Sequence, residues 1–430
     1  MNDLQEKAKL LKDDGRFEEA AKIYKELYDK NGDQWDGWGL TYCLCKIKKY
    51  KEALTLSEKI YQEHSDFEYI RSTYAWSLYM GKISQKSPDF DSKNIEKNLD
   101  IILALEQDRK FWSGKALYQT IDHFSKNNSW EAVYRISKKV DPSILENESR
   151  VWEGKTISSD REKWYSKTTK ACEKLEKWND CLEISKKGIE EFPNSSSRIW
   201  LERRYALSKG HCGYIEQSID LLKDVLIKKN EWFVYLDIAK MNYKNSNLAE
   251  QRNYLIQGCF LSKKKPDPGF RWEMYYDLGC NLLESLHSDD FKEYGKLHIQ
   301  LAYALRNDEG WPIPEHLQNV MKKHDIEEQF EKSGKQFIKE LSSFWEKEKP
   351  NPYAGQEKKT GKIKAIIGER KNAGFISSSG EDYYFTFGNL NFNGKSAEIG
   401  LEVSFFLEKS FDRKKNKDSV KAVEIDKLED

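Results

Sequence analysis

Apolar positions in the first part of the chain recur every three or four residues and stop at short polar turns. This spacing is that of one face of an α-helix, and after Gly15 it resumes on a second helix. The first two helices carry their apolar and small positions at Leu4, Ala8, Leu11, Phe17, Ala20, Tyr24 and Leu27. Similar patterns continue to about residue 345 and predict an all-α region built from helical hairpins.

The hairpins repeat along the chain. The segment GRFEEAAKIY (15–24) recurs as KKYKEALTLS (48–57), which places Ala20 and Ala53 33 residues apart. Weaker copies begin at Ser129, Lys177 and Gly213, and an insertion falls at 84–94. The pattern resembles the tetratricopeptide repeat, whose period is about 34 residues. The resemblance implies an α-solenoid of about seven or eight repeats over residues 1–310, with capping helices at 311–348.

Beyond residue 361 the apolar period changes to two, which is typical of β-strands. Alternation places Phe375 and Ile376 on opposite sides of one strand, and it places Tyr384 opposite Tyr383 and Phe385 on the next. We therefore expect Phe375 and Tyr384 on an open face, and Tyr383 and Phe385 in a core. Residues 349–360 combine prolines, glycine and charge, which predicts a linker.

Five segments of residues 361–430 resemble, in order, the strands of a cold-shock domain. They are GKIKAI (361–366), KNAGFI (371–376), DYYFTF (382–387), GLEVSFFL (400–407) and SVKAV (419–423). The resemblance implies a small all-β OB-fold barrel of five strands, which binds single-stranded RNA or DNA by stacking bases on aromatic rings and contacting phosphates with basic side chains. The nucleic-acid-binding residues that it implies are Lys364, Lys371, Phe375, Tyr384, Phe387, Phe392, Arg413, Lys414 and Lys415.

Three positions depart from the family pattern. Ala365 stands where the family usually has tryptophan, Ala373 replaces the first phenylalanine of the glycine–phenylalanine motif, and Thr386 replaces a histidine. Each stacked base contributes about 1 to 3 kcal/mol, so a smaller set of rings binds more weakly. We expect a weaker or differently shaped site than that of a typical family member.

Length and charge limit the number of domains and the kind of nucleic-acid binding that the chain can have. The 430 residues exceed one ordinary domain, and the acids and bases number 72 each, so the formal net charge is zero. A globally basic nucleic-acid binder is therefore excluded, and local patches must supply any attraction. Most of the 13 tryptophans are expected at helix crossings, whereas Trp35 and Trp38, beside a glycine turn, are candidates for a concave surface.

No pattern of catalytic residues is present in the sequence. The chain has no phosphate-binding glycine loop followed by lysine, and its seven histidines show no zinc-peptidase spacing. The seven cysteines are interpreted as reduced core residues. We expect no enzyme activity, no cofactor and no metal site. The absence of a long apolar stretch or leader pattern predicts a cytoplasmic protein that does not enter membranes.

These features predict a non-catalytic adaptor. Its solenoid groove would hold a protein partner, and its barrel would contact single-stranded RNA or DNA. One alternative is a pure protein scaffold whose barrel no longer binds nucleic acid, which Ala365 and Ala373 favour. Another makes the solenoid itself the RNA reader through its lysines and aromatic residues. An enzyme of unrecognised type is the third alternative.

Overall fold

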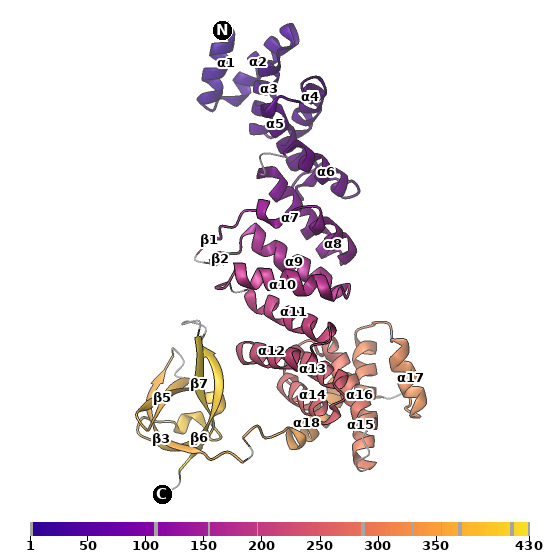
Figure 1. The fold of residues 1–430 in the computed structure, drawn as a ribbon, viewed down its shortest axis with the longest axis vertical. Coiled ribbons are helices and arrows are strands. Elements are labelled where there is room, and N and C mark those ends of the chain that lie inside the picture. The colour runs from indigo at the N-terminus through magenta and orange to yellow at the C-terminus, as the bar shows by residue number, and fades with distance from the viewer. Residues whose placement is uncertain are drawn as a thin grey trace. The chain divides into compact units, whose positions relative to one another are not determined.

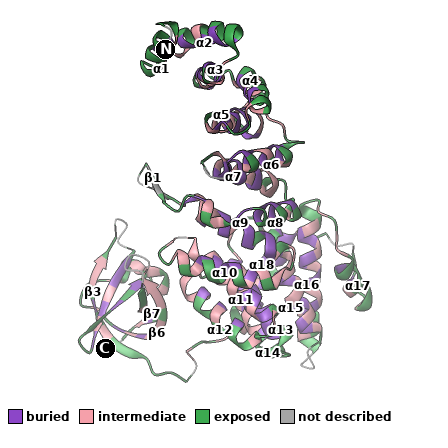
Figure 2. Cartoon of the chain, turned by 45° about the horizontal axis from the view of Figure 1, so that its top comes forward, coloured by how far each residue is buried: buried purple, intermediate pink, exposed green. Residues whose placement is uncertain are grey.

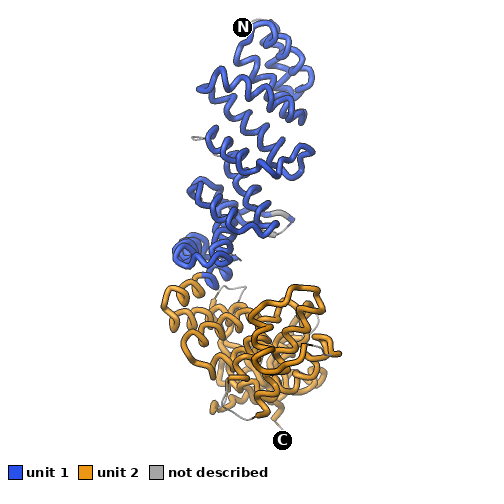
Figure 3. Tube along the Cα trace, turned by 90° about the vertical axis from the view of Figure 1, so that its right-hand side faces the viewer, with its two compact units in different colours: residues 1–204 blue, residues 205–430 orange. Residues whose placement is uncertain are grey.

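The computed structural model describes residues 3–106, 111–153, 155–195, 197–284, 289–328, 331–353, 355–368, 372–412 and 417–428. Helices dominate these residues as far as Glu348, and the strands of a barrel follow from Lys359 (Figure 1). The chain forms two compact units, Met1–Arg204 and Tyr205–Asp430 (Figure 3).

The first unit is a series of paired helices. They are α1 (Asp3–Asp13), α2 (Phe17–Asn31), α3 (Gln34–Lys46), α4 (Tyr50–Glu63), α5 (Glu68–Leu78), α6 (Ile95–Leu105), α7 (Phe111–Lys126), α8 (Trp130–Lys138), α9 (Asp160–Lys174) and α10 (Trp178–Glu191), followed by the first half of α11 (Arg198–His211). From α1 to α10, each helix packs on the next one along the chain.

Small residues let these helices approach closely. Ala8, Ala20 and Ala53 are fully buried where helices meet. A Cβ atom added at Gly39 would lie 2.6 Å from the ring of Tyr24. Helix α3 therefore lies so close to α2 that a residue larger than glycine would not fit at this position. Figure 2 shows buried residues along the helix sides that meet. The predicted helical hairpins are thus confirmed.

One short β-hairpin interrupts the first unit. Its strands are β1 (Arg150–Trp152) and β2 (Lys155–Ile157), and Val151 pairs with Thr156. The prediction of an exclusively helical region is wrong here. Both strands are three residues long, too short for a pattern of alternation to mark them, and β-branched residues favour the extended backbone.

The second unit continues with helices. They are α12 (Ile215–Lys228), α13 (Trp232–Lys244), α14 (Leu248–Ser262), α15 (Trp272–Glu284), α16 (Asp289–Asp308), α17 (Glu315–Lys323) and α18 (Gly334–Glu348). Helix α18 packs against α14 and α16. Its apolar side buries Phe337 and Trp345 almost completely, beside the equally buried Tyr275 of α15. Ser333 and Gln336 form a capping box that begins the helix.

Five strands close into a barrel. They are β3 (Lys359–Ile367), β4 (Ala373–Ser378), β5 (Glu381–Thr386), β6 (Glu402–Asp412) and β7 (Lys417–Lys427). Their order around the barrel is β3-β4-β5-β7-β6, with β3 closing on β6 and with β5 parallel to β7. The core contains Ile363, Ile376, Phe385, Val403, Phe405 and Ile425. A helical region followed by a five-stranded barrel confirms the predicted fold class.

Candidate nucleic-acid interface

Two aromatic rings lie side by side on the open face of β4 and β5. Phe375 and Tyr384 are directly paired across the strands, and their ring centroids are 5.7 Å apart at 66°. Tyr384 is 39% exposed, whereas Tyr383 and Phe385 on either side of it are buried. The predicted alternation of these residues is therefore confirmed. A partly exposed pair of rings can stack against bases or against apolar side chains.

Lys364 already has a partner on this face. Its Nζ atom donates a hydrogen bond of 2.6 Å to Oδ2 of Asp382. That bond lowers the pKa of the Asp382 carboxyl below its ordinary value. Because β3 and β5 flank β4, the ion pair crosses β4. A phosphate would have to compete with Asp382 for this lysine.

The other predicted aromatic residues lie differently. Phe387 is partly buried against the barrel core, and its ring is parallel to that of Phe385 at 6.2 Å. Phe392 also packs on the core, with Lys427 Nζ 5.3 Å from the centroid of its ring. Both rings therefore serve the packing of the barrel as well as its surface. The remaining predicted residues, Lys371, Arg413, Lys414 and Lys415, lie outside the described residues.

A groove next to Phe387 adds residues that the sequence analysis did not identify. Its volume is about 570 Å³, and it is lined by Ile366, Asn372, Phe387, Asn393, Gly394, Lys395 and Ala397. A Cβ atom at Gly394 would lie 2.5 Å from the Phe387 ring, so this glycine lets the ring reach the groove wall. The groove combines one ring, two amides and one ammonium group, which is the set that contacts a base and its phosphate. The segment NFNGK, with its alternating amides, is the signal that could have indicated it.

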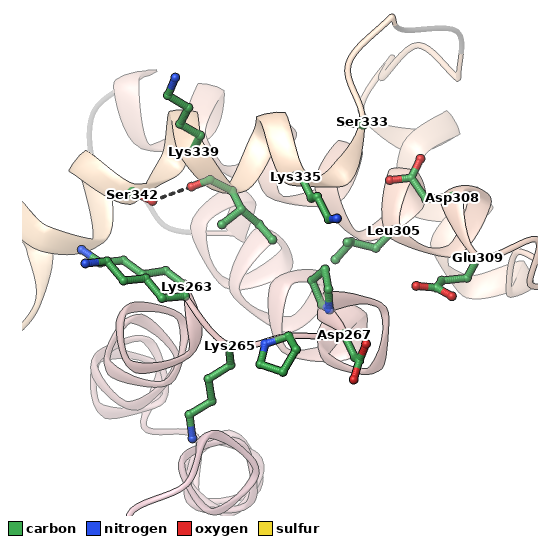
Figure 4. A pocket seen from close by; sticks show the side chains of 14 residues that line it. Lys263, Lys265, Asp267, Leu305, Asp308, Glu309, Ser333, Lys335, Lys339 and Ser342 are labelled. Carbon is green, nitrogen blue, oxygen red and sulfur yellow. Dashed lines mark hydrogen bonds between the residues drawn. The ribbon is translucent and has the colours of Figure 1, made fainter.

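A larger pocket of about 880 Å³ lies among the helices of the second unit (Figure 4). It is lined by Lys263, Lys264, Lys265, Pro266, Asp267, Pro268, Leu305, Asp308, Glu309, Ser333, Lys335, Ile338, Lys339 and Ser342. Lys263 donates to Glu346 at 3.2 Å, Lys265 pairs with Glu231, and Lys339 points away from Leu305 (Figure 4). The ammonium groups diverge, so this pocket is not a convergent anion site.

Two thiols of α3 are buried. Burial raises the pKa of Cys43 and of Cys45 to about 12, which keeps both thiols protonated at neutral pH. The described residues contain no group of three histidine, cysteine or acidic side chains placed to hold a metal ion. Among the described helices, none is both long enough and apolar enough to cross a bilayer.

The chain matches no known protein family and no curated protein. Among solved structures it is similar to human IFIT1 in a dimer with m7Gppp-AAAA, with 14% identity and a TM-score of 0.38 over 79% of this chain and 78% of that one. It is similar to YrrB, described as a TPR protein with an unusual peptide-binding site, with 10% identity and a TM-score of 0.31 over 57% and 95%. It is also similar to Naa15/Naa10 bound to HypK-THB, with 14% identity and a TM-score of 0.41 over 82% and 52%. Identities and TM-scores this low assign neither a family nor a function.

Proposed function

We propose that this protein is a non-catalytic adaptor. Its barrel contacts single-stranded RNA or DNA, and its helical repeats hold a protein partner. The observation that carries the proposal is the pair of Phe375, which is partly exposed, and Tyr384, which is exposed, on the open sheet face. The likeness of residues 361–430 to cold-shock domains supports the same surface, because that family exposes rings on matching strands.

The barrel binds nucleic acid weakly because few groups are available among the described residues of its open face. Two rings contribute about 2 to 6 kcal/mol if each stacks on one base. Lys364 on the same face is already paired, because Asp382 accepts its hydrogen bond. Phosphate attraction must therefore come from other basic groups, such as Lys395 beside Phe387. We expect a dissociation constant for a short single strand in the micromolar range, about −8 kcal/mol, or weaker.

Tethering compensates for this weak binding. A module joined to a bound partner works at an effective concentration that reaches about the millimolar range for short flexible connections. A nucleic acid held by the partner would meet the barrel at that concentration. The adaptor thus needs no tight site of its own, which agrees with the small ring pair and the occupied lysine.

The proposal is tested by titrating a fluorescein-labelled oligouridylate and its deoxythymidylate counterpart with the full-length protein. The double variant Phe375→Ala/Tyr384→Ala should lose about 2 to 4 kcal/mol of binding free energy. Ile399→Ala is the matched control, because that side chain is 68% exposed on the barrel and lies outside the ring pair. Equal affinity of a folded double variant and the wild type would refute the interface.

A second candidate function is a protein scaffold whose barrel does not bind nucleic acid. The observation that favours it is the ion pair between Lys364 and Asp382, which makes one lysine of the open face less available to a phosphate. Under this alternative, no oligonucleotide binds the barrel at any accessible concentration, and the double variant keeps all partner binding. The same titration therefore separates the two functions.

A further inference from the structure

Aromatic side chains form a continuous row across α3, α5 and α7 of the first unit. We call it the aromatic row, and its members are Trp35, Trp38, Tyr42, Phe67, Tyr69, Trp76, Phe111 and Trp112. The ring centroids of Trp38 and Tyr69 are 5.1 Å apart, and those of Tyr42 and Trp76 are 5.8 Å apart. These contacts connect three non-consecutive helices through rings alone.

Much of this row is open to solvent. Phe111 is 60% exposed, Trp35 is 49% exposed and Tyr69 is 44% exposed. Single exposed aromatic residues are ordinary, but neighbouring ones that span several helices mark an interaction surface. Trp35 and Tyr69 also contact each other, with centroids 5.2 Å apart, so they present one apolar area.

Lysines accompany the rings at the period of the repeat. Lys12 Nζ lies 4.7 Å from the centroid of Trp38, and Lys46 Nζ lies 5.3 Å from Tyr42 and 5.6 Å from Trp76. Lys12 and Lys46 are 34 residues apart (46 − 12), and so are Tyr42 and Trp76 (76 − 42). The same pairing of an ammonium group with a ring recurs in successive repeats, with Lys12 Nζ 5.9 Å from the centroid of Tyr42 and Lys46 Nζ 5.6 Å from that of Trp76.

Two ammonium groups, those of Lys12 and Lys46, lie over the rings of this surface. Lys46 is exposed and has no carboxylate partner in the part of the chain that the structure describes. Lys12 lies 3.9 Å from the exposed carboxylate of Asp13, which is a loose ion pair. Asp36 does not face the solvent, because it is 2% exposed and accepts a hydrogen bond of 3.2 Å from Gln5. Ammonium groups and the positive edges of tilted rings together attract anionic groups.

The position of the lysines decides between two kinds of anionic partner. A nucleobase stacks on a ring face, but the ammonium groups of Lys12 and Lys46 already lie over the faces of Trp38 and Tyr42. A carboxylate can form ion pairs with those ammonium groups without displacing them from the rings, while an apolar side chain covers the neighbouring ring edges. The surface thus fits a polypeptide better than a nucleic acid.

We propose that the aromatic row binds an extended peptide in which acidic side chains recur about every third residue among apolar ones. This inference rests on the proposed function, because it specifies the chemistry of the protein partner. Adjacent helices pack about 8 to 10 Å apart, and an extended chain advances about 3.3 Å per residue. Acidic residues about three positions apart would therefore meet the lysines of helices α1 and α3.

The test uses the full-length protein and a fluorescein-labelled peptide of about twelve residues, with aspartate at every third position between leucine and proline. A second peptide has asparagine in place of aspartate. Lys46→Glu should weaken binding of the aspartate peptide about tenfold or more, because an ion pair becomes a repulsion. Lys25→Glu is the charge-matched control, since Lys25 is exposed on α2 and outside the row, and it should change affinity less than about twofold.

Equal binding of the two peptides, or of the aspartate peptide to the wild type and Lys46→Glu, overturns the inference. So does a loss of labelled oligouridylate binding in Lys46→Glu with no effect on the peptide, which would make the row a nucleic-acid surface. Lys46→Gln provides a second variant that removes charge without adding repulsion. The barrel titration with Phe375→Ala/Tyr384→Ala is measured separately. A negative result with the peptides therefore does not contradict the nucleic-acid part of the proposed function.

Discussion

The indole N–H of Trp345 donates a hydrogen bond of 2.8 Å to Nε2 of His298, and both side chains are fully buried. Nδ1 of the same imidazole lies 2.6 Å from the carbonyl oxygen of Tyr294. The ring is therefore neutral, with its proton on Nδ1, because Nε2 must accept and Nδ1 must donate. This bond joins α18 to α16 and fixes the last helix before the barrel sequence.

Stability should depend on pH through His298. Burial lowers its pKa from 6.5 to about 4, so the unfolded chain binds the proton first as pH falls. The stabilisation is complete above pH 6.5 and is lost as pH falls toward 4, at about 1.4 kcal/mol per pH unit inside this window. Urea unfolding of the wild type and of His298→Asn at several pH values measures it. An identical pH dependence in both proteins would contradict the assignment.

Removing the carboxylate of Asp382 should strengthen nucleic-acid binding. Asp382→Asn leaves Lys364 free to meet a phosphate, so we expect tighter binding of a labelled oligouridylate by a few-fold and a steeper salt dependence, by about 0.7 in the logarithmic slope. Glu398→Gln is the control, because it removes one exposed negative charge without releasing Lys364. The same gain in both variants would show a general charge effect instead.

The basic loop should bind phosphates without reading sequence. Arg413, Lys414 and Lys415 lie outside the described residues, so this prediction comes from the sequence alone. Changing all three to glutamine should weaken binding similarly for different sequences. It should also flatten the logarithmic salt slope by about 0.7 for each phosphate that the loop no longer neutralises. An unchanged slope in a variant that still binds would place the phosphate-binding groups elsewhere, at Lys364 and Lys371.

Helix packing in the first unit should depend on Gly39. A Cβ atom there would overlap the Tyr24 ring at 2.6 Å, so Gly39→Ala should destabilise the protein by about 1 to 3 kcal/mol. Gly81→Ala is the control, because the nearest atom to its added Cβ lies 3.7 Å away. Thermal unfolding measures both variants. A loss of stability confined to Gly81→Ala would show that the approach of α3 to α2 is not tight.

The main elements could be predicted from the spacing of apolar residues. A spacing of three or four residues is typical of a helix, and a spacing of two is typical of a strand. Ala20 and Ala53 indicated the helical repeat, and the alternation around Tyr384 indicated which rings face the barrel core. The domain limits at 310, 348 and 360 and the binding roles of the site residues remain predictions. Such patterns indicate which face of a helix or strand is buried, but they do not give the distances between side chains that define a binding site.

Tertiary relationships could not be predicted from the pattern. Lys364, which pairs with Asp382, lies at a register shift between Ile363 and Ala365. No pattern of residues in the segment predicts that shift. Nor could the sequence separate exposed from packed tryptophans. Trp35 is half exposed and Trp345 is fully buried, although both lie on helices, because their exposure depends on which helix packs beside them.

In the proposed function, the ring pair on the barrel contacts the bound nucleic acid. Ultraviolet cross-linking of the full-length protein to a labelled oligouridylate, followed by mass spectrometric mapping of the attached residue, tests it most directly. We expect cross-links at Phe375 or Tyr384, whose ring centroids lie 5.7 Å apart on the open face. Cross-links confined to the aromatic row of the first unit, or none at a saturating concentration, would contradict it.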